Sequence, residues 1–167
     1  MDKLAVKDNR LYAIIMNYDM KSKFFKNVLD SISDEDSHNR LNTNANHIAW
    51  LAGSLVEQRF ETANILNPNN ILQQEAHEMF KDNQGIKEGL TYPSLEQYNR
   101  EWDKITPVLR KLLLNAEAEK AETTIEFPGM SMTILEFLAF GIYREANHIG
   151  QLALWRRLLG YEPMKYM

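Results

Sequence analysis

Residues 133–159 read TILEFLAFGIYREANHIGQLALWRRLL, and this stretch decides the fold class. It opens with Thr133 and Glu136, which have the spacing of the capping box at a helix N-terminus. Gly160 and Pro163 follow, as is typical of the end of a helix. The stretch therefore predicts one helix over 133–159, and about 26 residues at 1.5 Å each make it roughly 39 Å long.

Apolar residues recur at steps of three and four in three further stretches, which predict helices over 9–31, 44–66 and 94–119. Residues 43–46 are of types that cap helices well, and Ser94 with Gln97 has the spacing of a second capping box. Pro107 lies inside its helix, where we expect a kink. Helices of this length cannot bury their apolar faces alone, so the sequence predicts an all-α four-helix bundle.

The composition of the 167-residue chain is that of one globular domain, and we expect residues 1–167 to form a single bundle. Hydrophobic residues at 44% and charged residues at 25% exclude wholesale disorder. With 7 Gly and 5 Pro, the chain has too few turn formers for an all-β fold. A net charge of −4 offers nucleic acid no basic field, so we expect no such partner.

The chain contains no cysteine, which excludes disulfides, thiolate metal sites and a cysteine nucleophile. It has no apolar run of 18 residues and no basic-then-apolar N-terminus. We therefore expect no membrane span and no secretion, and we expect a cytoplasmic location.

Two metal motifs fail on the spacing of their residues. His77 and Glu78 begin the zinc-protease motif His-Glu-x-x-His, but Lys81 stands where the second His is required. Residues 34–38 imitate the start of a calcium loop, yet Asn39 replaces the Gly that the loop needs. We expect this acidic run to be a solvated turn. Between residues 71 and 93 the periodicity is weak and predicts only a short helix, around 72–80, followed by a loop.

Glu145 and His148 form a Glu-x-x-His pair inside the helix over 133–159. Di-iron bundle proteins use this pair twice, together with two further inward glutamates. None of the other three predicted helices contains the pair. It therefore does not predict a di-iron centre.

Arg144, His148 and Gln151 share one face of the same helix, at steps of four and three. Polar and charged side chains on a buried face need partners, because an unpaired buried charge is very costly. Two interpretations follow from residue types alone. Either His148 is a hydrogen-bonded core residue and Arg144 part of a buried ion pair, or the face belongs to a binding site.

Three segments resemble the DinB-like family of small cytoplasmic four-helix bundles. Residues 144–159, REANHIGQLALWRRLL, resemble the family's His-x-x-x-His segment followed by Gly-Gln. Residues 45–55, ANHIAWLAGSL, resemble its Asn-x-Ile-Ala-Trp segment followed by Gly-His-Leu. Residues 91–94, TYPS, resemble the entry to its third helix. The resemblance covers essentially the whole chain and implies a DinB-like bundle.

The resemblance also implies a divalent metal site, Ni²⁺ or Zn²⁺, with three histidines as ligands. The matching positions here are Ser54, Arg144 and His148, so only His148 is a good ligand. Arg144 is a fixed cation that repels a metal, and Ser54 is a weak ligand. His47 lies seven residues before Ser54, about 10 Å along the helix axis, which is too far to replace the missing ligand. We therefore expect a degenerate metal site and no bound metal; any metal would have to use His148 and His47.

Two functional classes remain. In the first, the pocket between the helices over 44–66 and 133–159 binds a small ligand, such as an anion, or a protein partner. We expect its lining to include Ser54, Glu57, Arg144, His148 and Gln151. The alternative is an enzyme, since the resemblance extends to thiol-dependent transferases, maleylpyruvate isomerases and metal-dependent hydrolases. A low-molecular-weight thiol or a divalent metal would then be the cofactor, with His148 as acid–base and Arg144 holding an anion. A closed Arg144–Glu57 ion pair would instead favour a purely structural role.

The C-terminal end is rich in aromatic residues and methionine, at Trp155, Leu158, Tyr161, Met164, Tyr166 and Met167. Part of this set belongs to a helical core, but the tail has an exposed pattern. Together with the resemblance, it predicts a homodimer.

Overall fold

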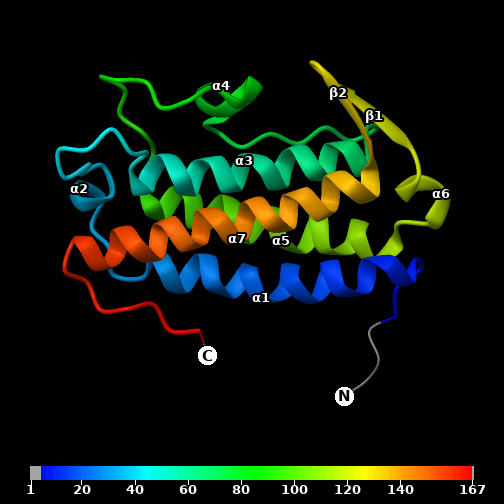
Figure 1. Ribbon diagram of the computed structural model, residues 1–167, viewed down its shortest axis with the longest axis horizontal. Coiled ribbons are helices and arrows are strands. Elements are labelled where there is room, and N and C mark those ends of the chain that lie inside the picture. Colours follow the sequence, from blue (N-terminus) through cyan, green and yellow to red (C-terminus); the bar gives the residue numbers. More distant parts are fainter. Residues whose placement is uncertain (1–4, 167) are drawn as a thin grey trace.

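Four long helices form the bundle of the computed structural model, which describes residues 5–166 (Figure 1). They are α1 (Tyr12–Leu29), α3 (Ile48–Leu66), α5 (Leu95–Asn115) and α7 (Ile134–Leu158). The predicted all-α four-helix class is confirmed. Met167, which we assigned to the aromatic C-terminal end, lies outside the described residues.

Short elements precede or connect the long helices. They include the 3₁₀ turns η1 (Asn9–Leu11), directly before α1, and η2 (Lys81–Asn83), and the one-turn helices α2 (Asp34–Ser37), α4 (His77–Phe80) and α6 (Ala118–Ala121). The strands β1 (Thr124–Phe127) and β2 (Met130–Thr133) form a hairpin before α7. The hairpin pairs Phe127 with Met130 across Pro128-Gly129, and Gly129 has the positive φ of 81° that the turn requires. No helix of the described part is long and apolar enough to cross a membrane.

The predicted caps account for two of the helix starts. Thr133 accepts a hydrogen bond from the amide of Glu136, whose carboxylate accepts one from the amide of Thr133, which completes the capping box of α7. The Ser94 hydroxyl accepts from the amide of Gln97 at α5. The expected start of α3 at 44 is wrong: the helix begins after His47, whose Nδ1 accepts from the Trp50 amide at 3.1 Å.

Three other expectations need correction. The third helix ends at Asn115 rather than 119, because the backbone of Ala116 turns extended. The helix expected around 72–80 shrinks to α4, since the side chain of Asn64 bonds both the N–H and the C=O of Leu72, which lies in no helix. The run at 34–38 is not a simple solvated turn but the capped one-turn helix α2.

Helices that follow one another in the sequence are not all antiparallel neighbours in the bundle. α1 and α7 run side by side in one direction, and α3 and α5 run side by side in the opposite direction (Figure 1). Residues 67–94 must therefore travel back along the whole bundle between α3 and α5, and they pass over α3. This long connection becomes a wall of the candidate site.

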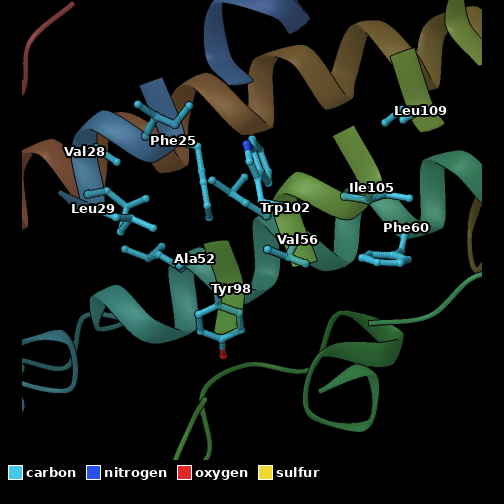
Figure 2. Close-up of a cluster of buried hydrophobic side chains, with 14 of the residues drawn as sticks. Phe25, Val28, Leu29, Ala52, Val56, Phe60, Tyr98, Trp102, Ile105 and Leu109 are labelled. Carbon is cyan, nitrogen blue, oxygen red and sulfur yellow. The ribbon is translucent and has the colours of Figure 1, made fainter. Parts of the chain in front are cut away.

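Apolar side chains from α1, α3 and α5 interlock in the core shown in Figure 2. The rings of Phe25 and Trp102 stack with their centroids 3.9 Å apart. The fully buried Arg59 also packs on this tryptophan, with its guanidinium carbon 3.4 Å from the Trp102 ring centroid. The core thus contains a charge that must be neutralised from a neighbouring helix.

Candidate functional site

A cavity of about 220 Å³ lies between α3, α7 and the connection over α3. Its lining consists of Asn46, Trp50, Leu51, Ser54, Glu57, Glu61, Phe80, Gln84, Arg144, His148 and Gln151. All five residues that the sequence suggested for a pocket are among them. Known ligand pockets mostly enclose about 300–1,000 Å³, so this cavity suits a molecule smaller than a typical drug.

Arg144 reaches across from α7 to α3, which run antiparallel. Its Nη2 donates to the Ser54 hydroxyl at 2.7 Å, and its Nη1 donates to Gln58 Oε1 at 2.6 Å and to the Ser54 carbonyl at 3.4 Å. No carboxylate oxygen of residues 5–166 lies within the 4.0 Å of an ion pair with this guanidinium. Burial lowers the pKa of Arg144, and the charges of Glu61 and Glu145 oppose that effect.

Glu57 does not form the ion pair with Arg144 that would have closed the site. Its Oε1 lies 2.5 Å from Nδ1 of His77, and its Oε2 accepts from Gln74 Nε2 at 2.8 Å. Both partners come from the connection over α3, at 17 and 20 residues' separation. The sequence does not predict this pairing, because the connection carries no helical periodicity that would indicate which of its side chains face α3.

Glu61 is the other acidic residue of the lining and was not among the residues predicted for the pocket. It follows Glu57 by four residues and Ser54 by seven, a spacing that places all three on one face of α3 and could have revealed it. Burial raises the pKa of Glu61, and the neighbouring charge of Glu57 raises it further. The charges of Arg144 and His77 oppose this rise.

His148 has one ring nitrogen bonded and one not. Its Nδ1 lies 3.1 Å from the backbone carbonyl of Arg144, one turn earlier on α7. Its Nε2 is buried and has no hydrogen-bond partner among the described residues. Burial, together with the charge of Arg144, lowers the pKa of His148 to about 4, so the ring is neutral near pH 7.

Trp50 faces His148 across the cavity end of α3 and α7, with ring centroids 6.3 Å apart and ring planes 27° apart. Only 9% of Trp50 is exposed, and its indole N–H has no partner among residues 5–166. Gln151 lies at the exposed rim, where its amide donates to Asn147 Oδ1 at 2.7 Å.

Glu145 belongs to the core rather than to the cavity. Its Oε1 accepts from Arg59 Nε at 2.8 Å, and its Oε2 lies 4.0 Å from Nζ of Lys21. Burial lowers the pKa of Lys21 to about 8, against the pull of Glu145. Within the Glu-x-x-His pair of α7, Glu145 therefore belongs to an interior ion pair and not to a metal site with His148. The same spacing joins Glu35 on α2 to His38, the C-cap of that short helix, outside the long helices.

The residues at the metal position implied by resemblance do not fit a Ni²⁺ or Zn²⁺ centre. Arg144 already bonds Ser54 there, and a guanidinium cannot release a lone pair to a metal. Among the described residues, no three His, Asp or Glu side chains converge as a ligand set. His47 cannot contribute, because its Nδ1 caps α3 and its ring lies against His38 and Tyr92.

Comparisons with known proteins agree with the bundle. The family model described as the DinB family matches residues 16–166. A solved structure, a conserved protein from Enterococcus faecalis, aligns with a TM-score of 0.70 at 14% identity, covering 89% of this chain and 96% of that chain. At that identity the likeness concerns the fold alone. No curated protein matches the chain.

Proposed function

The chain belongs to the DinB family, and we propose that its cavity between α3 and α7 binds a small carboxylate with Arg144 as the anchoring cation. The guanidinium stands at the position where the resemblance implies a metal ligand. It brings one fixed positive charge to that place, together with planar donors that match a carboxylate.

One observation carries this proposal: Arg144 lines the cavity with only neutral acceptors around it. Its partners are the Ser54 hydroxyl, the Ser54 carbonyl and the Gln58 amide oxygen. A partly buried cation without a counter-ion is costly, and a ligand carboxylate would remove that cost. The Arg59 guanidinium, by contrast, is neutralised within the fold by Glu145.

Neither acidic residue of the lining forms an ion pair with Arg144. Glu57 is engaged by His77 and Gln74, and burial raises the pKa of Glu61 against the opposing charge of Arg144. The cavity volume of about 220 Å³ lies just below the roughly 300–1,000 Å³ usual for ligand pockets. A carboxylic acid the size of butyrate or benzoate suits that space.

Calorimetric titration with benzoate and butyrate tests the proposal. We expect binding by the unmodified protein and its loss in Arg144→Met, which keeps most of the side-chain volume but removes the charge. Arg157→Met is the matched control, because Arg157 is exposed on the same helix and outside the cavity. Equal binding by Arg144→Met and the unmodified protein would refute the role of Arg144.

An enzymatic function is the second candidate, and the state of His148 favours it. A neutral imidazole with an unpaired Nε2 beside a guanidinium is suited to move a proton while the cation holds an anion. Because the chain has no cysteine, a thiol reaction would need a low-molecular-weight thiol as cofactor. Thiol-dependent turnover that disappears in His148→Phe would support this candidate.

For a partner, we propose a second copy of the chain. The outer faces of α1 and α7, which lie side by side, expose the large apolar residues Tyr12, Met16, Met20, Phe140, Tyr143, Leu154 and Leu158. Exposed apolar patches of this kind mark interaction surfaces. Of the C-terminal residues, Trp155 and Met164 are buried, whereas Leu158 and Tyr166 are exposed. The cytoplasmic location stays a prediction that cell fractionation would test.

A further inference from the structure

Two buried polar atoms at one end of the cavity lack partners among the described residues: the indole Nε1 of Trp50 and the ring Nε2 of His148. Their rings are neighbours, with centroids 6.3 Å apart. Buried polar atoms are almost always hydrogen-bonded in native proteins, so two unpaired ones side by side call for an explanation.

The two atoms have opposite hydrogen-bonding character. The indole nitrogen of Trp50 is always a donor. The Nδ1 of His148 lies 3.1 Å from the Arg144 carbonyl, which can only accept, so Nδ1 carries the proton of the neutral ring. Nε2 of His148 therefore presents a lone pair. A hydroxyl group donates and accepts at once, so a single hydroxyl can pair with both atoms.

Two pairs of residues face each other between the antiparallel helices α3 and α7. Arg144 bonds Ser54 in the first pair, and His148 faces Trp50 in the second. On each helix the two residues are four positions apart, which corresponds to about 6 Å along the axis. The side chains of Leu51 and Phe80 add apolar wall to the same cavity.

We propose that the carboxylate bound at this site is a hydroxy acid, with its carboxylate on Arg144 and its hydroxyl between Trp50 and His148. The inference rests on the proposed function and adds the class of ligand to it. The spacing between the two residue pairs requires the carboxylate and the hydroxyl of the ligand to be separated, as in 4-hydroxybutyrate or 3-hydroxybenzoate. A 2-hydroxy acid, whose hydroxyl adjoins the carboxylate, cannot reach both pairs.

Calorimetry with matched acids tests the inference on the full chain. We expect 4-hydroxybutyrate to bind at least about tenfold more tightly than butyrate, and 3-hydroxybenzoate at least about tenfold more tightly than benzoate, because a site with unpaired polar groups rejects the analogue that lacks the hydroxyl. 2-Hydroxybutyrate should bind no more tightly than butyrate.

Two variants locate the effect. Trp50→Phe and His148→Phe each remove one unpaired atom and keep a ring, so each should reduce the preference for the hydroxy acid over its plain analogue to less than threefold. If one variant fails to fold, the other variant and the comparison of matched acids still test the hydroxy-acid inference. Arg144→Met should abolish binding of every acid.

The failures can be told apart. Equal affinity for hydroxylated and plain acids, with binding still lost in Arg144→Met, would overturn the hydroxy-acid inference and leave the carboxylate site intact; a water molecule would then serve the two atoms. A preference that persists in both ring variants would also overturn it. Absence of binding by all five acids would overturn the inference and the proposed function together.

Discussion

Arg144 on α7 donates a 2.7 Å hydrogen bond to the hydroxyl of Ser54 on α3, so two positions where the resemblance implies metal ligands are bonded to each other. In the proposed carboxylate site, the Arg144 cation takes the place of the charge that a metal ion would bring to this part of the bundle. The cavity next to it keeps a positive group that no described carboxylate pairs with.

Restoring two histidines should restore a metal site. The double variant Ser54→His with Arg144→His should bind one equivalent of Ni²⁺ or Zn²⁺, because His148 then has two imidazole neighbours. Either single change should gain little. Elemental analysis and metal titration measure this. If the unmodified protein already holds one equivalent of metal on His148, our interpretation of Arg144 is wrong and the enzymatic candidate moves ahead.

The buried ion pair between Arg59 and Glu145 should be essential for stability. Arg59→Met leaves the Glu145 carboxylate buried with only Lys21, at 4.0 Å, and should lower the free energy of unfolding by about 3–5 kcal/mol. Urea unfolding measures the change. Lys26→Met, which breaks an exposed pair with Asp103, is the control and should have little effect. Equal effects of both changes would contradict the assignment.

Two glycines should respond oppositely to alanine. A Cβ on Gly53 would lie 2.2 Å from Cζ of Phe80 and 2.6 Å from the Tyr98 hydroxyl, so Gly53→Ala should cost about 1–3 kcal/mol of stability. Because Phe80 lines the cavity, carboxylate affinity should fall as well. A Cβ on Gly150, at an exposed position of α7, would have no atom within 4 Å. Gly150→Ala should therefore raise the stability of the fold by up to about 1 kcal/mol. Thermal unfolding of both variants checks the signs.

Acid should destabilise the fold partly through His47. Burial lowers the pKa of His47 to about 4, against 6.5 for an unperturbed imidazole. Between these values the unfolded chain binds more protons than the folded one, so this contribution to stability is lost as the pH falls from about 6.5 to about 4. It is constant above pH 6.5.

The variant His47→Asn keeps a residue that caps helices but does not titrate in this range. Urea unfolding between pH 4 and 7 should show a shallower loss of stability for the variant than for the unmodified protein. The raised pKa values of Glu61 and Glu101 act in the opposite direction, and they cancel in the comparison. Parallel pH profiles would contradict the prediction.

The proposed homodimer should be visible in solution. Light scattering at micromolar concentration should give twice the chain mass, with an interface of more than about 1,000 Å² in total. Met16→Glu together with Leu154→Glu places charges on the exposed apolar faces of α1 and α7 and should yield monomers. A strict monomer before any change would refute this partner.

The long helices were predictable because their periodicity and caps are local. Thr133 with Glu136 caps α7 as its spacing indicated, and the apolar steps of the other helices gave their approximate positions. The start of α3 was misplaced, since His47 is an uncommon cap whose role depends on its ring nitrogen. The hairpin after α6 was not predicted from the sequence, because its strands have only four residues each.

Only those residues of the candidate site that lie on the helices α3 and α7 were predictable. Arg144 and His148 share a face of α7 by spacing alone, and Ser54 came from the resemblance. The pairing of Glu57 with His77 depends on how the connection over α3 returns along the bundle, and no local pattern encodes that path. The same holds for Arg59, whose partner Glu145 lies 86 residues away.

The central claim is that Arg144 is the anchoring cation of a carboxylate site, and a crystal structure of the protein with 3-hydroxybenzoate tests it most directly. The account predicts a carboxylate within hydrogen-bond distance of the Arg144 guanidinium, about 2.7–2.9 Å. Density for the acid elsewhere, with Arg144 turned onto Glu61 or Glu57, would contradict it.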